Sequence, residues 1–431
     1  MNNSLGESLN DIAWQDLFSK YEILKKIENE GLFKISANSI KEFREPRLMV
    51  KFDHLANLPQ LFKDNNLAIL PVSRGDYVIS HFKAYHSFDT TETEIIPVTI
   101  PQHLQSLDFK NISSESIALN SALASQILTD FLDEEEIYAT VSGRMGSGVF
   151  NFNIENTNLN RQQSIKVENS QIEIDAAYEG IKSLAIFEAK IDLSEDFLVR
   201  QMYYPYRVWE SKIRKEVRTV FLIYSNGIYR LFEYKFLDKN DYNSLNLVKK
   251  RNYSLEDTAI EITDIEILLQ QAPILEEPQI PFPQADSFER VINICELIND
   301  LEITRDEVTE QYSFDARQTN YYTDAARYIG LLDRKYKGKL PVYFLTDTGR
   351  KILKLGYKER QLAYCVQILK HKAFHFTLSR YLERGTMPSI EEIVRIMINS
   401  QLYEVRGEST LKRRASTIRG WVNWIVSLIN N

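Results

Sequence analysis

The chain has 431 residues, of which 44% are hydrophobic and 26% charged, a composition typical of a globular protein with two or three domains. It contains no apolar run of about 18 residues and no start typical of a signal peptide, so we expect a cytoplasmic protein without a membrane span. Cys295 and Cys365 lie in apolar stretches without metal-ligand spacing, which predicts buried thiols in a reducing compartment.

The charge is distributed unevenly along the chain. The net charge is -8, which at first argues against a nucleic-acid partner. From Asp286 to the end, however, 23 Lys and Arg residues stand against 18 Asp and Glu, so this segment carries +5 and the preceding residues carry -13. A basic C-terminal unit on an acidic body is suited to DNA contact through one part of the molecule.

A proline-rich segment divides the chain. Residues 272–285 read APILEEPQIPFPQA, and four prolines at this density block both a helix and a central strand, so we predict a linker. Before it, we expect an N-terminal α/β region over 1–110, with helical periodicity at 11–29, and a second region over 111–271. After it, a mainly helical unit should occupy 286–431.

The second region has the pattern of a mixed α/β core. A helical pattern at 114–136 precedes a glycine-containing stretch, 142–148, that we interpret as a loop entering a strand. The glycines would let Arg144 approach a DNA phosphate, although a merely flexible loop explains them equally well. Strands and one helix then follow in the order strand, strand, helix, strand, strand, at 171–178, 184–192, 195–211, 218–226 and 228–236.

Two charged residues interrupt the most apolar of these strands. Glu188 and Lys190 lie within the run LAIFEAKID, which reads as a strand covered on both faces. Because they are two residues apart, their side chains leave the same face. Burying either charge alone would cost several kcal/mol, roughly, so both need compensation by each other, by a metal or by a substrate.

The preceding strand supplies another acid. A turn near Gly180 would bring Asp175 beside Glu188, and two adjacent carboxylates repel each other unless a cation lies between them. We therefore expect Mg²⁺ bound by Asp175, Glu188 and the carbonyl of Ala189, with Lys190 stabilising the nucleophile and the transition-state charge of phosphodiester hydrolysis. Glu173 is the rival to Asp175. The alternative is an ordinary ion pair, Glu188 with Lys190 or Asp175 with Lys182.

These residues resemble the motif of the PD-(D/E)XK nuclease superfamily. The match covers Ile174-Asp175 and Glu188-Ala189-Lys190, and Ile174 replaces the usual proline. Gln201 and Tyr204 in the next helix are similar to a glutamine and a tyrosine that follow the core in several of these nucleases. The resemblance implies a mixed-sheet core like that of restriction endonucleases, Mg²⁺ as cofactor, and Asp175, Glu188, Lys190 and Gln201 as catalytic residues.

Further residues are candidates for supporting roles. One of Glu134, Glu135 and Glu136 could be the additional carboxylate that some of these nucleases carry, although a solvated helix end explains the run as well. In the N-terminal region Arg44 and Arg47 could read guanine, or they could form a structural ion-pair cluster.

The C-terminal unit has the order of a winged helix-turn-helix, three helices and then a strand pair. Thr304 is a plausible N-cap of the second helix. We predict DNA contacts from the third helix, from the hairpin and from a basic cluster near the C-terminus: Arg317, Gln318, Asn320, Lys335, Lys337, Lys339, Lys412, Arg413, Arg414 and Arg419.

The function favoured by these patterns is that of a type II restriction endonuclease. Such an enzyme would bind double-stranded DNA as a homodimer, so that two sites address two strands, and a DNA methyltransferase would be encoded nearby. One alternative is a repair or structure-specific nuclease on the same core. Another is a non-enzymatic winged-helix DNA-binding regulator, which leaves the first 271 residues unexplained.

Overall fold

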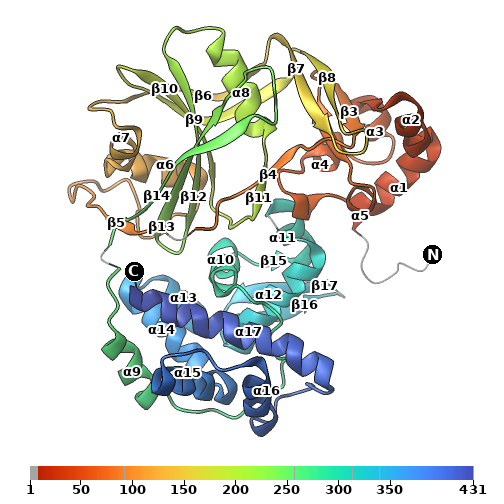
Figure 1. The fold of residues 1–431 in the computed structure, drawn as a ribbon. Helices are drawn as coiled ribbons and strands as arrows, with labels where there is room; N and C mark the ends of the chain where they lie inside the picture. The colour runs from red at the N-terminus through yellow and green to blue at the C-terminus, as the bar shows by residue number, and fades with distance from the viewer. Residues whose placement is uncertain are drawn as a thin grey trace.

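The computed structural model describes residues 8–91, 93–256, 258–299, 301–312, 314–338 and 340–430. They form an N-terminal unit, a central unit built on a large sheet, and a mainly helical C-terminal unit (Figure 1). Among the residues so described, no helix has both the length and the apolar character needed to cross a membrane.

The N-terminal unit combines short helices with a three-stranded antiparallel sheet. Its core holds Trp14, which is fully buried and packs edge-on against Phe62 with ring centroids 4.8 Å apart. The helical pattern expected over 11–29 is split at Glu22, whose φ of 49° is left-handed and ends the first helix. The elements are α1 (Leu9–Tyr21), α2 (Ile23–Glu30), β1 (Phe33–Ser36), α3 (Ala37–Lys41), α4 (Pro46–Val50), α5 (Gln60–Asp64), β2 (Ala68–Pro71) and β3 (Asp76–Ser80).

The central unit is built on a mixed sheet, as the sequence predicts, and this sheet has seven strands. Its strand order is β5-β14-β13-β12-β10-β9-β6, in which β10 runs parallel to β12 and antiparallel to β9. The strands are β5 (Ile95–Pro97), β6 (Tyr138–Gly146), β9 (Gln171–Glu179), β10 (Ser183–Lys190), β12 (Glu216–Ser225), β13 (Ile228–Phe236) and β14 (Leu245–Ser254). β5 lies in the stretch that the sequence analysis assigned to the N-terminal region.

Helices cover both faces of this sheet. The α6 helix (Glu115–Ala124) and α7 (Ile127–Leu132) pack on the face that carries Phe187 and Ala189, and α8 (Arg200–Glu210) connects β10 to β12 across the other. The helix expected over 195–211 begins only at Arg200, because residues before it form β11 (Asp196–Leu198), which pairs with β4 (Tyr85–Ser87).

The glycine-containing stretch is a strand and not a loop. Residues through Gly146 belong to β6, the edge strand, and Ser147 and Gly148 lead into the hairpin of β7 (Val149–Asn156) and β8 (Arg161–Glu168). Gly143 has a φ of 88°, and the pairing with β9 shifts register just before it. Glycine tolerates this irregular edge geometry, so these glycines serve the strand.

The linker packs against the C-terminal unit. Residues 272–287 contain no helix or strand, but Phe282 is 1% exposed and stacks on Phe374. The helix α9 (Ile262–Gln271), which the sequence analysis placed in the second region, precedes the linker and packs against α14 and α15 of this unit. The unit itself contains α10 (Phe288–Ile298), β15 (Ile303–Thr304), α11 (Arg305–Gln311), α12 (Ala316–Tyr328), β16 (Leu332–Lys337), β17 (Leu340–Leu345), α13 (Asp347–Leu353), α14 (Tyr357–Leu369), α15 (Lys372–Arg384), α16 (Ile390–Asn399) and α17 (Glu408–Ser427). Thr304 caps α11, as predicted. Both cysteines are buried thiols.

Candidate functional site

The end of β10 brings the predicted acidic residues together. The backbone pairing of β9 with β10 ends at Phe187 and Ala176. One step further, the Asp175 carboxylate turns to the neighbouring strand and its Oδ2 accepts a hydrogen bond from the N–H of Ala189 at 2.8 Å. Asp175 thus lies beside the strand segment that carries Glu188.

Lys190 lies at the centre of this cluster. Its Nζ donates to Glu188 Oε1 at 2.5 Å and to the Ala189 carbonyl at 3.2 Å, and it lies 3.6 Å from Glu115 Oε1. The side chains of Glu188 and Lys190 are only 10% and 12% exposed. The ammonium group therefore contacts two of the three atoms from which the sequence predicts a cation site.

The cluster holds more negative than positive charge. Burial lowers the pKa of Lys190, but Glu188, Glu115, Asp175 and Asp53 together raise it well above its ordinary value. Burial also raises the pKa of Glu188 to about 8, although Lys190 opposes that shift. Several carboxylates share the Lys190 ammonium group, although Lys51, His54 and Arg200 also act on Asp53, so an additional proton or cation beside Glu188 would be favourable.

Gln201 supports Glu188 from the other side. Its Nε2 donates to Glu188 Oε1 at 2.6 Å, while its own Oε1 is buried without a hydrogen-bond partner. The α8 helix presents it, because the first turn of that helix lies over the face of β10 that carries Glu188. Tyr204, one turn later, donates instead to the Pro71 carbonyl at 2.9 Å, so it joins the central unit to the N-terminal unit.

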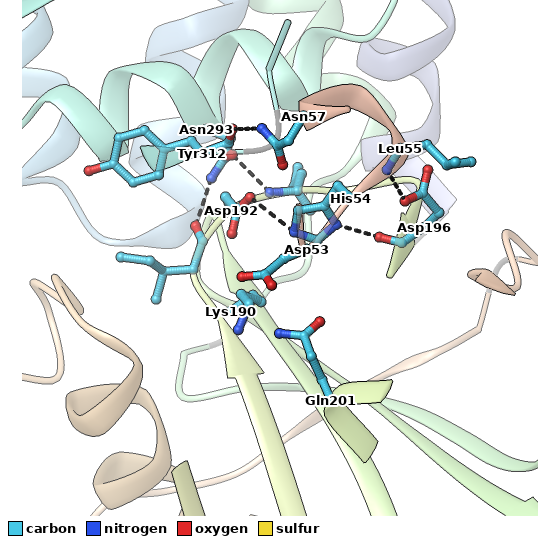
Figure 2. Close-up of polar contacts among 12 residues, drawn as sticks. Asp53, His54, Leu55, Asn57, Lys190, Asp192, Asp196, Gln201, Asn293 and Tyr312 are labelled. Carbon is cyan, nitrogen blue, oxygen red and sulfur yellow. Dashed lines mark hydrogen bonds and ion pairs between the residues drawn. The ribbon is translucent and has the colours of Figure 1, made fainter. Parts of the chain in front are cut away.

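Two carboxylates of the site were missed by the sequence analysis. Glu115 is the first residue of α6, directly after the N-cap Ser114. Asp53 comes from the N-terminal unit, and Figure 2 shows its side chain beside Lys190. Burial would raise the pKa of Asp53, but Lys190, Lys51, His54 and Arg200 hold it below its ordinary value. The capping position of Glu115 was readable from the sequence, whereas the long-range approach of Asp53 was not.

The other acidic candidates lie elsewhere. Glu134 is buried, and its Oε1 accepts from the backbone N–H of Ser183 at 3.1 Å and from the Ser183 hydroxyl at 3.0 Å. It therefore stabilises the turn between β9 and β10, while Glu135 and Glu136 are exposed. Glu173, the rival to Asp175, is exposed and pairs with Arg144 at 3.1 Å.

Hard oxygen atoms make this site chemically suitable for Mg²⁺. Asp175, Glu188 and the Ala189 carbonyl offer such atoms, and the high pKa of Glu188 reflects its need for a counter-charge. Throughout the described ranges, however, no three His, Cys, Asp or Glu side chains converge into a metal-binding group. The predicted set contains two such side chains and one carbonyl, and Lys190 would have to leave Glu188 for a cation to enter.

The predicted DNA contacts are dispersed over three units. Arg44 donates to the Asn10 side chain, and Arg47 is exposed on α4. Gln318 completes the capping box of α12, and Asn320 is half-buried on the same helix.

The cations that the sequence predicts as DNA contacts in the C-terminal unit lie on α12, on α17 and in the hairpin of β16 and β17. Arg317 is exposed and donates to the Tyr321 hydroxyl at 2.8 Å, while Lys412 pairs with Glu408 at 2.8 Å. Arg413, Arg419 and Lys337 are exposed, Arg414 is half-buried, Lys335 pairs with Glu302, and Lys339 lies outside the described residues.

Comparison with known proteins finds three family models, each described as a domain of unknown function. They are DUF6996 over residues 11–79, DUF6997 over 80–254 and DUF7226 over 290–430. No curated protein and no solved structure is significantly similar to the chain. Asp175, Glu188 and Lys190 fall within the DUF6997 match, while Asp53 falls within the DUF6996 match.

Proposed function

We propose that this protein is a Mg²⁺-dependent DNA endonuclease of the type II restriction class. The observation that carries the proposal is the arrangement at the end of β10, where Asp175 bonds to the N–H of Ala189 and Lys190 bonds to Glu188. Two acids and one lysine on adjacent strands are the groups that phosphodiester hydrolysis requires. The parallel pair β10 and β12, connected by α8, supplies the rigid support for them.

Each residue has a distinct task in this mechanism. Mg²⁺, when bound by Asp175, Glu188 and the Ala189 carbonyl, would supply Lewis-acid activation of a phosphoryl oxygen and of the attacking water. Lys190 would stabilise the negative charge that grows on the phosphoryl group, since its raised pKa keeps it protonated at neutral pH. Gln201 holds Glu188 Oε1 in place through the 2.6 Å hydrogen bond.

The C-terminal unit is the proposed DNA-binding part. Its elements follow the order α10, β15, α11, α12, β16, β17, which is typical of a winged helix-turn-helix. The α12 helix would be the recognition helix, with Arg317 exposed near its N-terminus. Arg414 on α17 lies within electrostatic range of Tyr321 and Asp324 on α12, so the basic cluster of α17 would extend the same surface.

The decisive experiment is digestion of plasmid DNA by the purified protein with Mg²⁺, followed by mapping of the ends. Cleavage at one defined sequence supports a restriction enzyme, whereas cleavage limited to flaps or junctions supports a repair or structure-specific nuclease. Light scattering during size-exclusion chromatography tests the proposed homodimer. A DNA methyltransferase gene adjacent to this one would favour restriction-modification further.

A second candidate function is that of a non-hydrolytic DNA-binding regulator. It is favoured by the low exposure of Glu188 and Lys190 and by the direct ion pair between them, which a purely structural role also explains. In that case the Glu188→Gln variant retains every activity of the wild type, and no metal-dependent cleavage is observed on any DNA substrate.

A further inference from the structure

The cation site as predicted has a conflict within it. The Nζ of Lys190 lies 2.5 Å from Glu188 Oε1 and 3.2 Å from the Ala189 carbonyl oxygen, which are two of the proposed ligand atoms. An ammonium group and a divalent cation repel each other strongly at such separations in a buried site. Binding of the cation therefore requires Lys190 to move to another carboxylate that stays close to the reacting phosphate.

Besides Glu188 and Asp175, two carboxylates act electrostatically on the Lys190 ammonium group, and either could receive it. Glu115 lies 3.6 Å from the Lys190 Nζ, but its side chain is 40% exposed and can rotate into solvent. The Asp53 side chain is only 14% exposed and is among the carboxylates that act on Lys190, and its Oδ2 also lies 3.6 Å from the Nζ of the exposed Lys51. Figure 2 shows the Asp53 side chain beside that of Lys190, with no ion pair drawn between them. Asp53 is the more fixed of the two acceptors.

The segment that carries Asp53 is held on both sides (Figure 2). The Asp53 carbonyl accepts from the N–H of Leu198 at 2.8 Å, and His54 Nδ1 lies 2.6 Å from the Asp196 carbonyl oxygen. Further along, Asn57 Nδ2 donates to the Tyr312 carbonyl of the C-terminal unit at 2.8 Å. These bonds connect all three units around Asp53, so the backbone that presents its carboxylate is held in place by the folded chain.

We propose that Asp53 is a positioning residue of the nuclease site, the carboxylate that receives Lys190 when a divalent cation occupies Glu188 and the Ala189 carbonyl. The N-terminal unit thus completes the site of the central unit. This inference rests on the proposed function, because it assumes that the cation binds there. Asp53 acts through Lys190, and it is not assigned as a ligand of the cation.

The test measures Mn²⁺ binding to the full-length protein by isothermal titration calorimetry without DNA. We expect Asp53→Asn to weaken Mn²⁺ binding by about tenfold, since Lys190 then stays on Glu188. Asp53→Glu should recover affinity to within about threefold of the wild type. The matched control is Asp16→Asn, an exposed acid of α1 in the same unit, which should leave binding unchanged.

A second pair of variants separates action through Lys190 from direct contact with the metal. In a Lys190→Met background, Asp53→Asn should change Mn²⁺ affinity by less than about threefold, because the group it receives is gone. A tenfold loss in both backgrounds would overturn the proposal, since Asp53 would then act on the metal itself. Equal affinity of wild type and Asp53→Asn would also overturn it.

The outcomes distinguish this proposal from the proposed function. If Glu188→Gln abolishes Mn²⁺ binding while Asp53→Asn binds normally, the role of Asp53 is wrong and the nuclease site stands. If the wild type binds no Mn²⁺ and cleaves no DNA, both proposals are wrong. Thermal melting of each variant detects a folding defect. If Asp53→Asn does not fold, the test falls on Asp53→Glu: a folded Asp53→Glu protein that does not bind Mn²⁺ overturns the role of Asp53.

Discussion

The central sheet contains two buried ion pairs of nearly equal exposure. Arg218 of β12 and Glu233 of β13 have side chains that are 14% and 10% exposed, against 12% and 10% for Lys190 and Glu188. The Arg218 fork makes two hydrogen bonds of 2.6 Å to the two oxygens of Glu233, and its Nη1 donates to the Leu132 carbonyl at 2.5 Å. Arg218 and Glu233 therefore satisfy each other's directional bonds, while Glu216 and Asp133 also act on Arg218.

The Lys190–Glu188 pair at the end of β10 differs in the number of acidic groups that surround its cation. Lys190 acts as counter-charge to Glu188, Glu115, Asp175 and Asp53, and the pKa of Glu188 rises to about 8 through burial. Gln201 adds a buried Oε1 without a partner. Burial alone therefore does not identify a functional site. A surplus of acidic groups around one lysine instead marks a candidate site, because a ligand or a proton would relieve their repulsion.

The largest expected effect is on cleavage. Replacing Asp175, Glu188 or Lys190 by Asn, Gln or Met should each lower the rate of plasmid cleavage at least about a hundredfold, since each removes a group that holds the cation or stabilises the transition state. Arg218→Met and Glu233→Gln should change the rate of the folded protein less than about threefold. Initial rates with saturating Mg²⁺, measured below each melting temperature, test this contrast.

DNA affinity serves as the control for that contrast. Electrophoretic mobility shifts with Ca²⁺ in place of Mg²⁺ should give affinities for the three site variants within about threefold of the wild type. If Glu188→Gln cleaves DNA at the wild-type rate, the Lys190–Glu188 pair has no role in cleavage and is a structural ion pair like Arg218–Glu233.

Stability should respond in the opposite order. Arg218→Met leaves Glu233 buried without its partner and should lower the free energy of unfolding by about 3–5 kcal/mol. Glu188→Gln removes a charge from an overcharged cluster, so its unfolding free energy at pH 8 should equal or exceed that of the wild type. Urea unfolding followed by circular dichroism measures both. A large loss in Glu188→Gln would identify the β10 pair as a structural one.

The pH dependence follows from the raised pKa of Glu188. The folded protein binds this proton more tightly than the unfolded chain, where the ordinary pKa of Glu is 4.5. The stability that it contributes is complete below that value and is lost as the pH rises through about 8. The difference in unfolding free energy between wild type and Glu188→Gln should therefore fall between pH 5 and 9, roughly.

Cleavage should change in the reverse direction over this pH range. Cation binding needs the deprotonated carboxylate, so the rate at low Mg²⁺ should rise toward pH 8, and higher Mg²⁺ should shift the midpoint to lower pH. Two results together would contradict the assignment of this proton to Glu188. The difference in unfolding free energy between wild type and Glu188→Gln would not vary with pH, and the midpoint of the pH dependence of cleavage would not vary with Mg²⁺ concentration.

The sequence predicted the parts of the fold that depend on local pattern. The apolar run around Glu188 and the strands that flank it appear in the sheet close to their expected bounds, because short, nearly continuous apolar runs are typical of strands buried on both faces. The edge strand β6 was missed, since its exposed residues show no alternation and its glycines suggested a loop. β14 was missed for the same reason, as its residues are mostly half-exposed.

The site was predictable only where its residues are close in sequence. Glu188 and Lys190 are two residues apart, and a single turn brings Asp175 to them. Asp53 lies more than 130 residues earlier, and its approach depends on bonds such as that from Leu198 to the Asp53 carbonyl. No periodicity encodes such tertiary contacts. One of the adjacent acids Glu134–Glu136 was a candidate for an additional carboxylate of the site. The structure shows instead that Glu134 accepts a hydrogen bond from the backbone N–H of Ser183 in the turn between β9 and β10.

The smallest expected effects are those of replacing Glu115 and Glu134, the two acids that precede the β9 and β10 strands in the sequence. Glu115→Gln removes a half-exposed partner 3.6 Å from the Lys190 Nζ, so we expect about a tenfold loss of cleavage and little change in melting temperature. Glu134→Gln should instead cost about 1–3 kcal/mol of stability, because it weakens the charged acceptor of the Ser183 bonds, and should leave the cleavage rate of the folded protein unchanged. Parallel measurements of initial rates and urea unfolding on the two variants separate these roles. A Glu134→Gln variant that is stable but inactive would indicate that Glu134, and not Glu115, is the acid that supports cleavage.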